Sequence, residues 1–145
     1  MPPEDELNAL ISFGNTLLYN QILQMIQKTT LDPRIGIVHA ANRRSTTLNL
    51  DFADLFKPII VDRVIFSLIN KYQIKKNRHF EKHENGIYLN KEGKKIFLEN
   101  FEAKMEQHLV IKGKEYTYKQ LILSEVRSYQ RYVTNNEKYR PYKYY

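Results

Sequence analysis

Two aspartates, Asp51 and Asp54, lie three residues apart in a stretch that is otherwise rich in leucine and phenylalanine, and His39 precedes them. If the stretch is helical, both carboxylates leave the same face of the helix. Two like charges side by side in apolar surroundings are costly unless a cation stands beside them. The residue types therefore indicate a site that requires a positive partner.

Two kinds of cation fit this requirement. Arg43 or Arg44 can fold back and pair with the carboxylates, which would be a purely structural arrangement. Alternatively, a divalent metal ion binds the carboxylates, and the preceding His39 contributes a neutral imidazole. A mixed nitrogen and oxygen ligand set suits Mn²⁺, and Mg²⁺ also serves if water completes an octahedron. Taken alone, the residue types favour the ion pair and leave the metal site open.

Two long helices are expected to position these groups. Apolar residues at three-and-four spacing predict a helix over about residues 2–30, in which Gly14 permits close approach of another backbone. A serine or threonine at 45–47 is expected to cap a second helix over about residues 48–72. Pro58 is expected to kink or divide this helix. The segment is apolar nearly all round, as is typical of a central, buried helix.

The remainder of the chain predicts shorter elements. Residues 73–86 are polar and charged and are interpreted as a flexible loop, in which His79 and His83 form a weak candidate pair of metal ligands. Asn90 is expected to cap a third helix, residues 111–116 to form a turn, and Thr117 to start the last helix. We therefore predict an all-α helical bundle, a single domain over residues 1–145, with at most one short β piece near Ile87–Leu89.

Composition narrows the class of protein. The chain contains no cysteine, which excludes a disulfide framework and a thiolate metal site and fits a reducing, cytoplasmic setting. The formal net charge of +7 favours polyanionic partners, nucleic acid above all. The longest apolar stretch is interrupted by Asp62 and Arg63 and is too short to span a bilayer. The N-terminus lacks the features of a secretory signal, so we expect a soluble protein with no membrane partner.

Three segments in this order resemble motifs of one known family. They are "PPEDELNALISFGNTLLY", "LDPRIGIVH" and "LNLDFADLFKPIIVDRVIFSLIN", and "GIYLNKEGKKIFLENFE" and the closing "YRPY" fit as well. The family is that of the CRISPR-associated spacer-integrating endonuclease. The resemblance runs from about Pro2 to Tyr142 and implies that the chain corresponds to the C-terminal, helical catalytic domain of the family protein.

The resemblance also implies a metal site. His39 and Asp54 match metal ligands of the family, Asp51 matches an acidic position that supports or contacts the ion, and the cofactor would be Mg²⁺ or Mn²⁺. A further glutamate ligand of the family lies on a helix before the Pro-Pro motif, and the family's N-terminal β-rich dimerisation domain precedes that. Neither is found in these 145 residues. We therefore expect the chain alone to be inactive, although the family is enzymatic.

The implied function is metal-dependent DNA cleavage and strand transfer during CRISPR spacer acquisition. The implied partners are DNA, the second, small CRISPR adaptation protein, and a second copy of the family protein. The candidate DNA-binding cations are Arg43, Arg44, Lys57, Lys75, Lys76 and Arg78, each of which also has a structural interpretation as an ion pair or a solvated loop. The alternative function is a helical DNA- or protein-binding remnant without catalysis.

Overall fold

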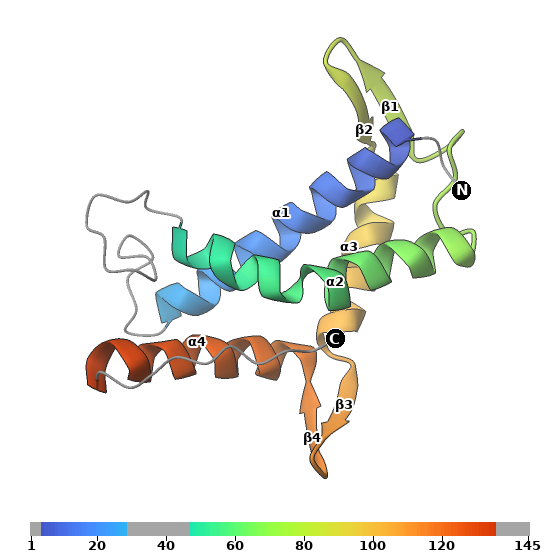
Figure 1. Cartoon of the computed structure of the whole chain (residues 1–145). Helices are drawn as coiled ribbons and strands as arrows, with labels where there is room; N and C mark the ends of the chain where they lie inside the picture. Colours follow the sequence, from blue (N-terminus) through green and yellow to red (C-terminus); the bar gives the residue numbers. More distant parts are fainter. Residues whose placement is uncertain (1–3, 29–46, 136–145) are drawn as a thin grey trace.

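The computed structural model describes residues 4–28 and 47–135 of the chain. In chain order the elements are α1 (Glu4–Lys28), α2 (Thr47–Asn70), β1 (Phe80–His83), β2 (Gly86–Leu89), α3 (Lys91–Met105), β3 (His108–Ile111), β4 (Lys114–Thr117) and α4 (Tyr118–Asn135) (Figure 1). The predicted helical class is confirmed. The β content is larger than predicted, because residues 4–28 and 47–135 contain four short strands where one was expected.

Helix α2 is the central element, as its composition predicted, and it contacts α1, α3 and α4. Its fully buried side chains include Phe56, Ile60 and Leu68, which join one core with residues from the other three helices. Pro58 lies inside α2, which continues from Thr47 to Asn70, so of the two outcomes expected at this proline, a kink or a division, the division does not occur. Burial on three sides stabilises the helix enough to tolerate the proline.

Gly14 permits a close approach, but of side chains and not of the backbone that we expected. A β-carbon at this position would lie 2.6 Å from Cγ1 of Val61 and 2.8 Å from Cζ of Phe97. The Phe97 ring in turn meets the ring of Phe13 edge to face, with 5.3 Å between the ring centroids. The glycine therefore lets α2 and α3 pack closely against α1.

The segment interpreted as a flexible loop contains a strand. β1 pairs antiparallel with β2, from Phe80 opposite Leu89 to His83 opposite Gly86. Most side chains of β1 are exposed, so the strand lacks the alternating apolar pattern by which a strand is recognised in a sequence. Packing of β2 against α1 and α3 supports the hairpin.

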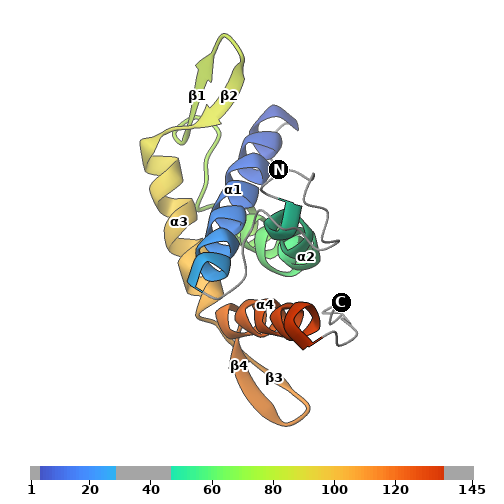
Figure 2. The same ribbon diagram turned by 90° about the vertical axis from the view of Figure 1, so that its left-hand side faces the viewer.

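A second hairpin surrounds the predicted turn. β3 pairs with β4 across Lys112 and Gly113, both of which have positive φ, as expected of a two-residue hairpin turn. The turn was therefore predicted correctly and the strands were missed. Figure 2 shows the two hairpins at opposite ends of α3, with α4 lying near the second of them.

The last two helices begin where the sequence predicted. The Asn90 side chain accepts a 2.8 Å hydrogen bond from the Gly93 N–H at the start of α3. Thr117 and Gln120 form a reciprocal cap before α4, because the Gln120 N–H donates to the threonine hydroxyl and the Thr117 N–H donates to the Gln120 side chain.

Candidate functional site

Asp54 lies near the N-terminal end of α2, on a side of the helix that faces away from the core. Its neighbours Phe52, Ala53 and Phe56 are buried, whereas the Asp54 side chain is 73% exposed. Apolar neighbours in the sequence therefore do not surround the carboxylate in space. The expectation that this aspartate is buried in apolar surroundings is wrong, and the carboxylate needs no buried cation to be tolerated.

Among the residues that the structure describes, Lys57, one turn along α2, forms an ion pair with this carboxylate. The Lys57 Nζ lies 3.5 Å from Oδ1 of Asp54, a spacing of three residues on a helical surface. Ion pairs of this exposed type contribute about 0–1 kcal/mol to stability. Lys57 therefore lies beside Asp54, and the ion pair between them is weak.

Pro58 adds a second polar feature at the same place. Proline has no N–H, so the carbonyl oxygen four residues earlier, that of Asp54, lacks the usual helical hydrogen bond from position 58. The exposed carboxylate and this carbonyl belong to the same residue. Both are oxygen ligands of the kind that Mg²⁺ and Mn²⁺ prefer.

The other proposed members of this site lie outside what the structure describes. His39, Arg43 and Arg44 fall in the segment 29–46, and Asp51 is placed in α2 without its side chain being described. Within residues 4–28 and 47–135, no group of three or more histidine, aspartate or glutamate side chains is arranged to hold a metal ion. Of the predicted metal ligands, only Asp54 can be located, and its chemistry and exposure fit that role.

The remaining predicted DNA-binding cations lie at the opposite end of α2. Lys75, Lys76 and Arg78 follow its C-terminus at Asn70, which lies 16 positions after Asp54 and so about 24 Å farther along the axis. Lys75 and Lys76 are exposed. The structure therefore does not bring them together with Asp54.

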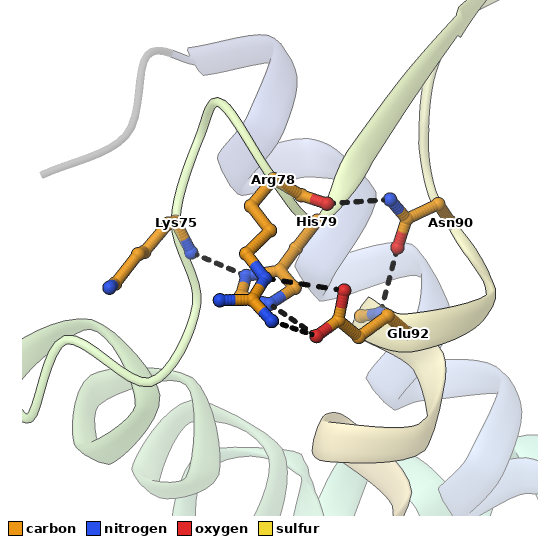
Figure 3. A network of polar contacts seen from close by, with 6 residues as sticks. Lys75, Arg78, His79, Asn90 and Glu92 are labelled. Carbon is orange, nitrogen blue, oxygen red and sulfur yellow. Dashed lines mark hydrogen bonds and ion pairs between the residues drawn. The ribbon is translucent and has the colours of Figure 1, made fainter.

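Arg78 takes part in an ion pair that joins the loop before β1 to α3. Its Nη2 lies 2.9 Å from Oε1 of Glu92, and its Nε lies 3.4 Å from Oε2 (Figure 3). The Asn90 side chain also donates a 2.7 Å hydrogen bond to the carbonyl of Arg78. In this arrangement the guanidinium is engaged by protein groups and supports the fold.

His79 is the centre of this network, and the sequence did not reveal its role. The residue is only 3% exposed, and its Nδ1 accepts a 2.8 Å hydrogen bond from the Lys75 N–H. Its Nε2 faces Oε1 of Glu92 at 3.8 Å, and its carbonyl accepts a hydrogen bond from the Asn90 N–H (Figure 3). His83 is exposed at the end of β1 and pairs with Glu81. The two histidines therefore have separate protein partners in the structure.

The helices that the structure describes include none with the length and apolar character required to cross a bilayer.

Comparison with known proteins identifies similar chains. A family model described as CRISPR associated protein Cas1 matches residues 1–103. The chain is 47% identical, over 143 residues, to "CRISPR-associated endonuclease Cas1 2" of Thermodesulfovibrio yellowstonii, covering 97% of this chain and 43% of that protein. It is 48% identical over 106 residues to "CRISPR-associated endonuclease Cas1" of Thermotoga maritima, covering 73% of this chain and 33% of that one. The chain thus spans less than half the length of these relatives.

Solved structures agree with the sequence comparison. A Cas1 protein from Thermotoga maritima superposes with a TM-score of 0.81 at 40% identity, covering 92% of this chain and 41% of that chain. A casposase bound to its integration product superposes with a TM-score of 0.78 at 26% identity, covering 90% of this chain and 38% of that chain.

Proposed function

The chain belongs to the CRISPR-associated Cas1 family, and from this premise we propose that it forms part of a metal-dependent DNA endonuclease and integrase that acts in spacer acquisition. The observation that supports the proposal most strongly is the alignment of 97% of the chain with a relative named an endonuclease. The likeness to a casposase bound to an integration product adds support for strand transfer as well as cleavage.

Within this function we propose His39 and Asp54 as metal ligands and Asp51 as a supporting acid. Bound there, Mg²⁺ or Mn²⁺ would supply Lewis-acid stabilisation of the charge that develops on a phosphodiester during cleavage or transesterification. The exposed carboxylate of Asp54 is accessible to solvent and therefore to DNA. Asp51 would orient ligands by hydrogen bonding.

Lys57 is proposed to serve the same site through its charge. Its ammonium pairs with Asp54 when no other cation neutralises that carboxylate. A lysine on an exposed helical surface is free to change rotamer and contact a DNA phosphate instead. Arg43 and Arg44, next to His39 in the sequence, are proposed to hold a second phosphate through bidentate hydrogen bonds.

We also propose the partners that the family suggests: DNA, the second, small CRISPR adaptation protein, and a second copy of the whole protein, all in the cytoplasm. The part of the relatives that this chain does not span would contribute the remaining glutamate ligand. The chain alone would then cleave DNA poorly or not at all.

A chimaera tests the proposal, because the chain and the Thermodesulfovibrio yellowstonii relative align over nearly all of the chain. This chain replaces the matching part of the relative, and cleavage of a DNA duplex is measured with Mn²⁺ present and after chelation. We expect metal-dependent cleavage that His39→Ala and Asp54→Ala each abolish. Cleavage that survives both substitutions would refute the site. A chimaera that binds DNA without any cleavage would favour the alternative of a non-catalytic binding protein.

A further inference from the structure

A basic groove lies between α2 and α3, apart from the site that contains Asp54. The two helices contact each other where they cross (Figure 1), and beside the contact is a hollow of about 450 Å³. Its polar lining residues are Arg63, Ser67, Lys71, Asn100, Lys104 and Gln107. We call this hollow the α2–α3 groove.

The groove concentrates positive charge without compensation. Three of its lining residues are cationic, and no lining residue is acidic. Within the part of the chain that the structure describes, Arg63 and Lys71 belong to no ion pair, whereas Lys57, Arg78 and Lys119 each have a carboxylate partner. The lining of the groove is therefore basic, and no carboxylate of the described residues pairs with Arg63 or Lys71.

The third cation, Lys104, is held in position by neutral groups. Its Nζ donates a 3.0 Å hydrogen bond to Oε1 of Gln107 and lies 4.4 Å from the centre of the Tyr118 ring. Neither partner neutralises the ammonium, so the side chain is ordered and keeps its full charge. A cation with a fixed position loses little entropy when it binds an anion.

The spacing of the cations matches a polymer better than a single small anion. Arg63 and Ser67 lie on α2, and Lys71 directly follows its last residue with its N–H still bonded to the Ser67 carbonyl. At these four-residue intervals the two cations are about 12 Å apart along the helix axis, with a hydroxyl between them. A DNA strand carries one phosphate for every ~3.4 Å of duplex. Serine, asparagine and glutamine side chains are common hydrogen-bond partners of such phosphates.

We propose that the α2–α3 groove is a second DNA-binding surface, which holds the sugar–phosphate backbone of a DNA segment outside the reacting site. The proposal deepens the proposed function and rests on DNA being the substrate. Arg63 lies nine residues after Asp54, which places the two on opposite sides of α2. The groove therefore cannot hold the phosphate that is cut at Asp54, and its contribution is to affinity and not to the chemical step.

One substitution tests the groove without deleting a contact of the core. Ser67→Glu places a carboxylate four residues from both Arg63 and Lys71, where it forms ion pairs along α2 and occupies the cations. Ser67→Gln is the matched neutral control. We expect Ser67→Glu to weaken binding of a DNA duplex about tenfold or more at moderate salt, and Ser67→Gln to change it by less than about twofold. Thermal unfolding confirms that both variants fold.

A second pair of variants measures the number of phosphate contacts. Arg63→Gln with Lys71→Gln removes two charges from the groove, and Lys112→Gln with Lys114→Gln removes two from the exposed β3–β4 turn. The slope of log K against log salt concentration should fall in magnitude by about 1.8 for the groove pair, which corresponds to two phosphates. If the groove pair and the turn pair have the same affinity and slope, the proposal is wrong.

The measurement separates this proposal from the proposed function. Binding is measured with the whole chain in a metal chelator, so metal binding at Asp54 does not contribute to the measured affinity. Groove variants that bind normally overturn the groove even if Asp54→Ala abolishes cleavage by the chimaera. Cleavage that survives Asp54→Ala overturns the proposed function even if the groove variants bind weakly. Displacement of DNA by poly-glutamate of equal charge, at equal concentration, would instead indicate an acidic protein partner and contradict the proposal.

Discussion

The Nδ1 atom of His79 accepts a 2.8 Å hydrogen bond from the backbone N–H of Lys75, four residues earlier. An acceptor at Nδ1 means that the neutral ring carries its proton on Nε2, which is the atom that faces Glu92. The ring thus fixes the loop before β1 against α3. His79 is buried, although its neighbours in the sequence are mostly charged and exposed. Its contacts with Lys75 and Glu92 give this position a structural function.

His79→Ala is expected to destabilise the fold by about 2–4 kcal/mol, because it leaves the Lys75 N–H without its acceptor and opens a cavity. Urea denaturation monitored by circular dichroism measures the change. His79→Asn is the control, since its side-chain oxygen can replace Nδ1 as acceptor, and it should restore about 1 kcal/mol. Equal losses for both variants would show that ring packing, and not the hydrogen bond, matters here.

Asn90 has two separable functions at the start of α3. Its side-chain oxygen caps the helix by accepting from the Gly93 N–H, and its amide donates to the Arg78 carbonyl. Asn90→Ala removes both and should cost about 1–2 kcal/mol in unfolding free energy. Asn90→Ser retains a cap and should lose roughly half as much. A serine variant as unstable as the alanine variant would mean that the link to Arg78 dominates.

Gly14→Ala is expected to destabilise the protein although alanine favours helices by about 1 kcal/mol over glycine. The added methyl would meet Val61 and Phe97 within 2.8 Å, and overpacking of a core typically costs about 1–3 kcal/mol. Gly93→Ala is the comparison, because its methyl would lie 2.6 Å from the His79 carbonyl oxygen, which is backbone and less able to move. The melting temperature should fall further for Gly93→Ala. A stabilised Gly14→Ala would show that the core rings relax freely.

Asp54→Asn should leave stability nearly unchanged while removing activity. The side chain is largely exposed and its pair with Lys57 is weak, so we expect a change of less than about 0.5 kcal/mol in unfolding free energy. DNA cleavage by the chimaera should fall below detection. Asp62→Asn, an exposed aspartate elsewhere on α2, is the control and should cleave normally. If Asp54→Asn loses cleavage and also lowers the unfolding free energy by well over about 0.5 kcal/mol, the residue is structural and not a metal ligand.

Local sequence was sufficient for features that depend on a few consecutive residues. The cap at Asn90 and the start of α4 after Thr117 were predicted because capping involves groups within four residues of each other. The central place of α2 followed from its apolar composition. The family followed from motifs whose order and spacing are properties of the sequence itself.

Tertiary structure decided the features that depend on distant partners. The two hairpins escaped prediction because their strands have four residues each and are supported by packing against helices. The apolar sequence neighbours of Asp54 predicted a buried carboxylate. Successive side chains of a helix point in different directions, however, and α1, α3 and α4 cover sides of α2 other than the one that carries Asp54. His79 and Glu92 are 13 residues apart, so no short-range pattern predicts their contact. The α2–α3 groove likewise exists only because two helices cross. The sequence by itself thus determined the helices, their caps and the family, whereas the fold decided which charges are exposed, paired or gathered, because burial depends on what packs from elsewhere in the chain.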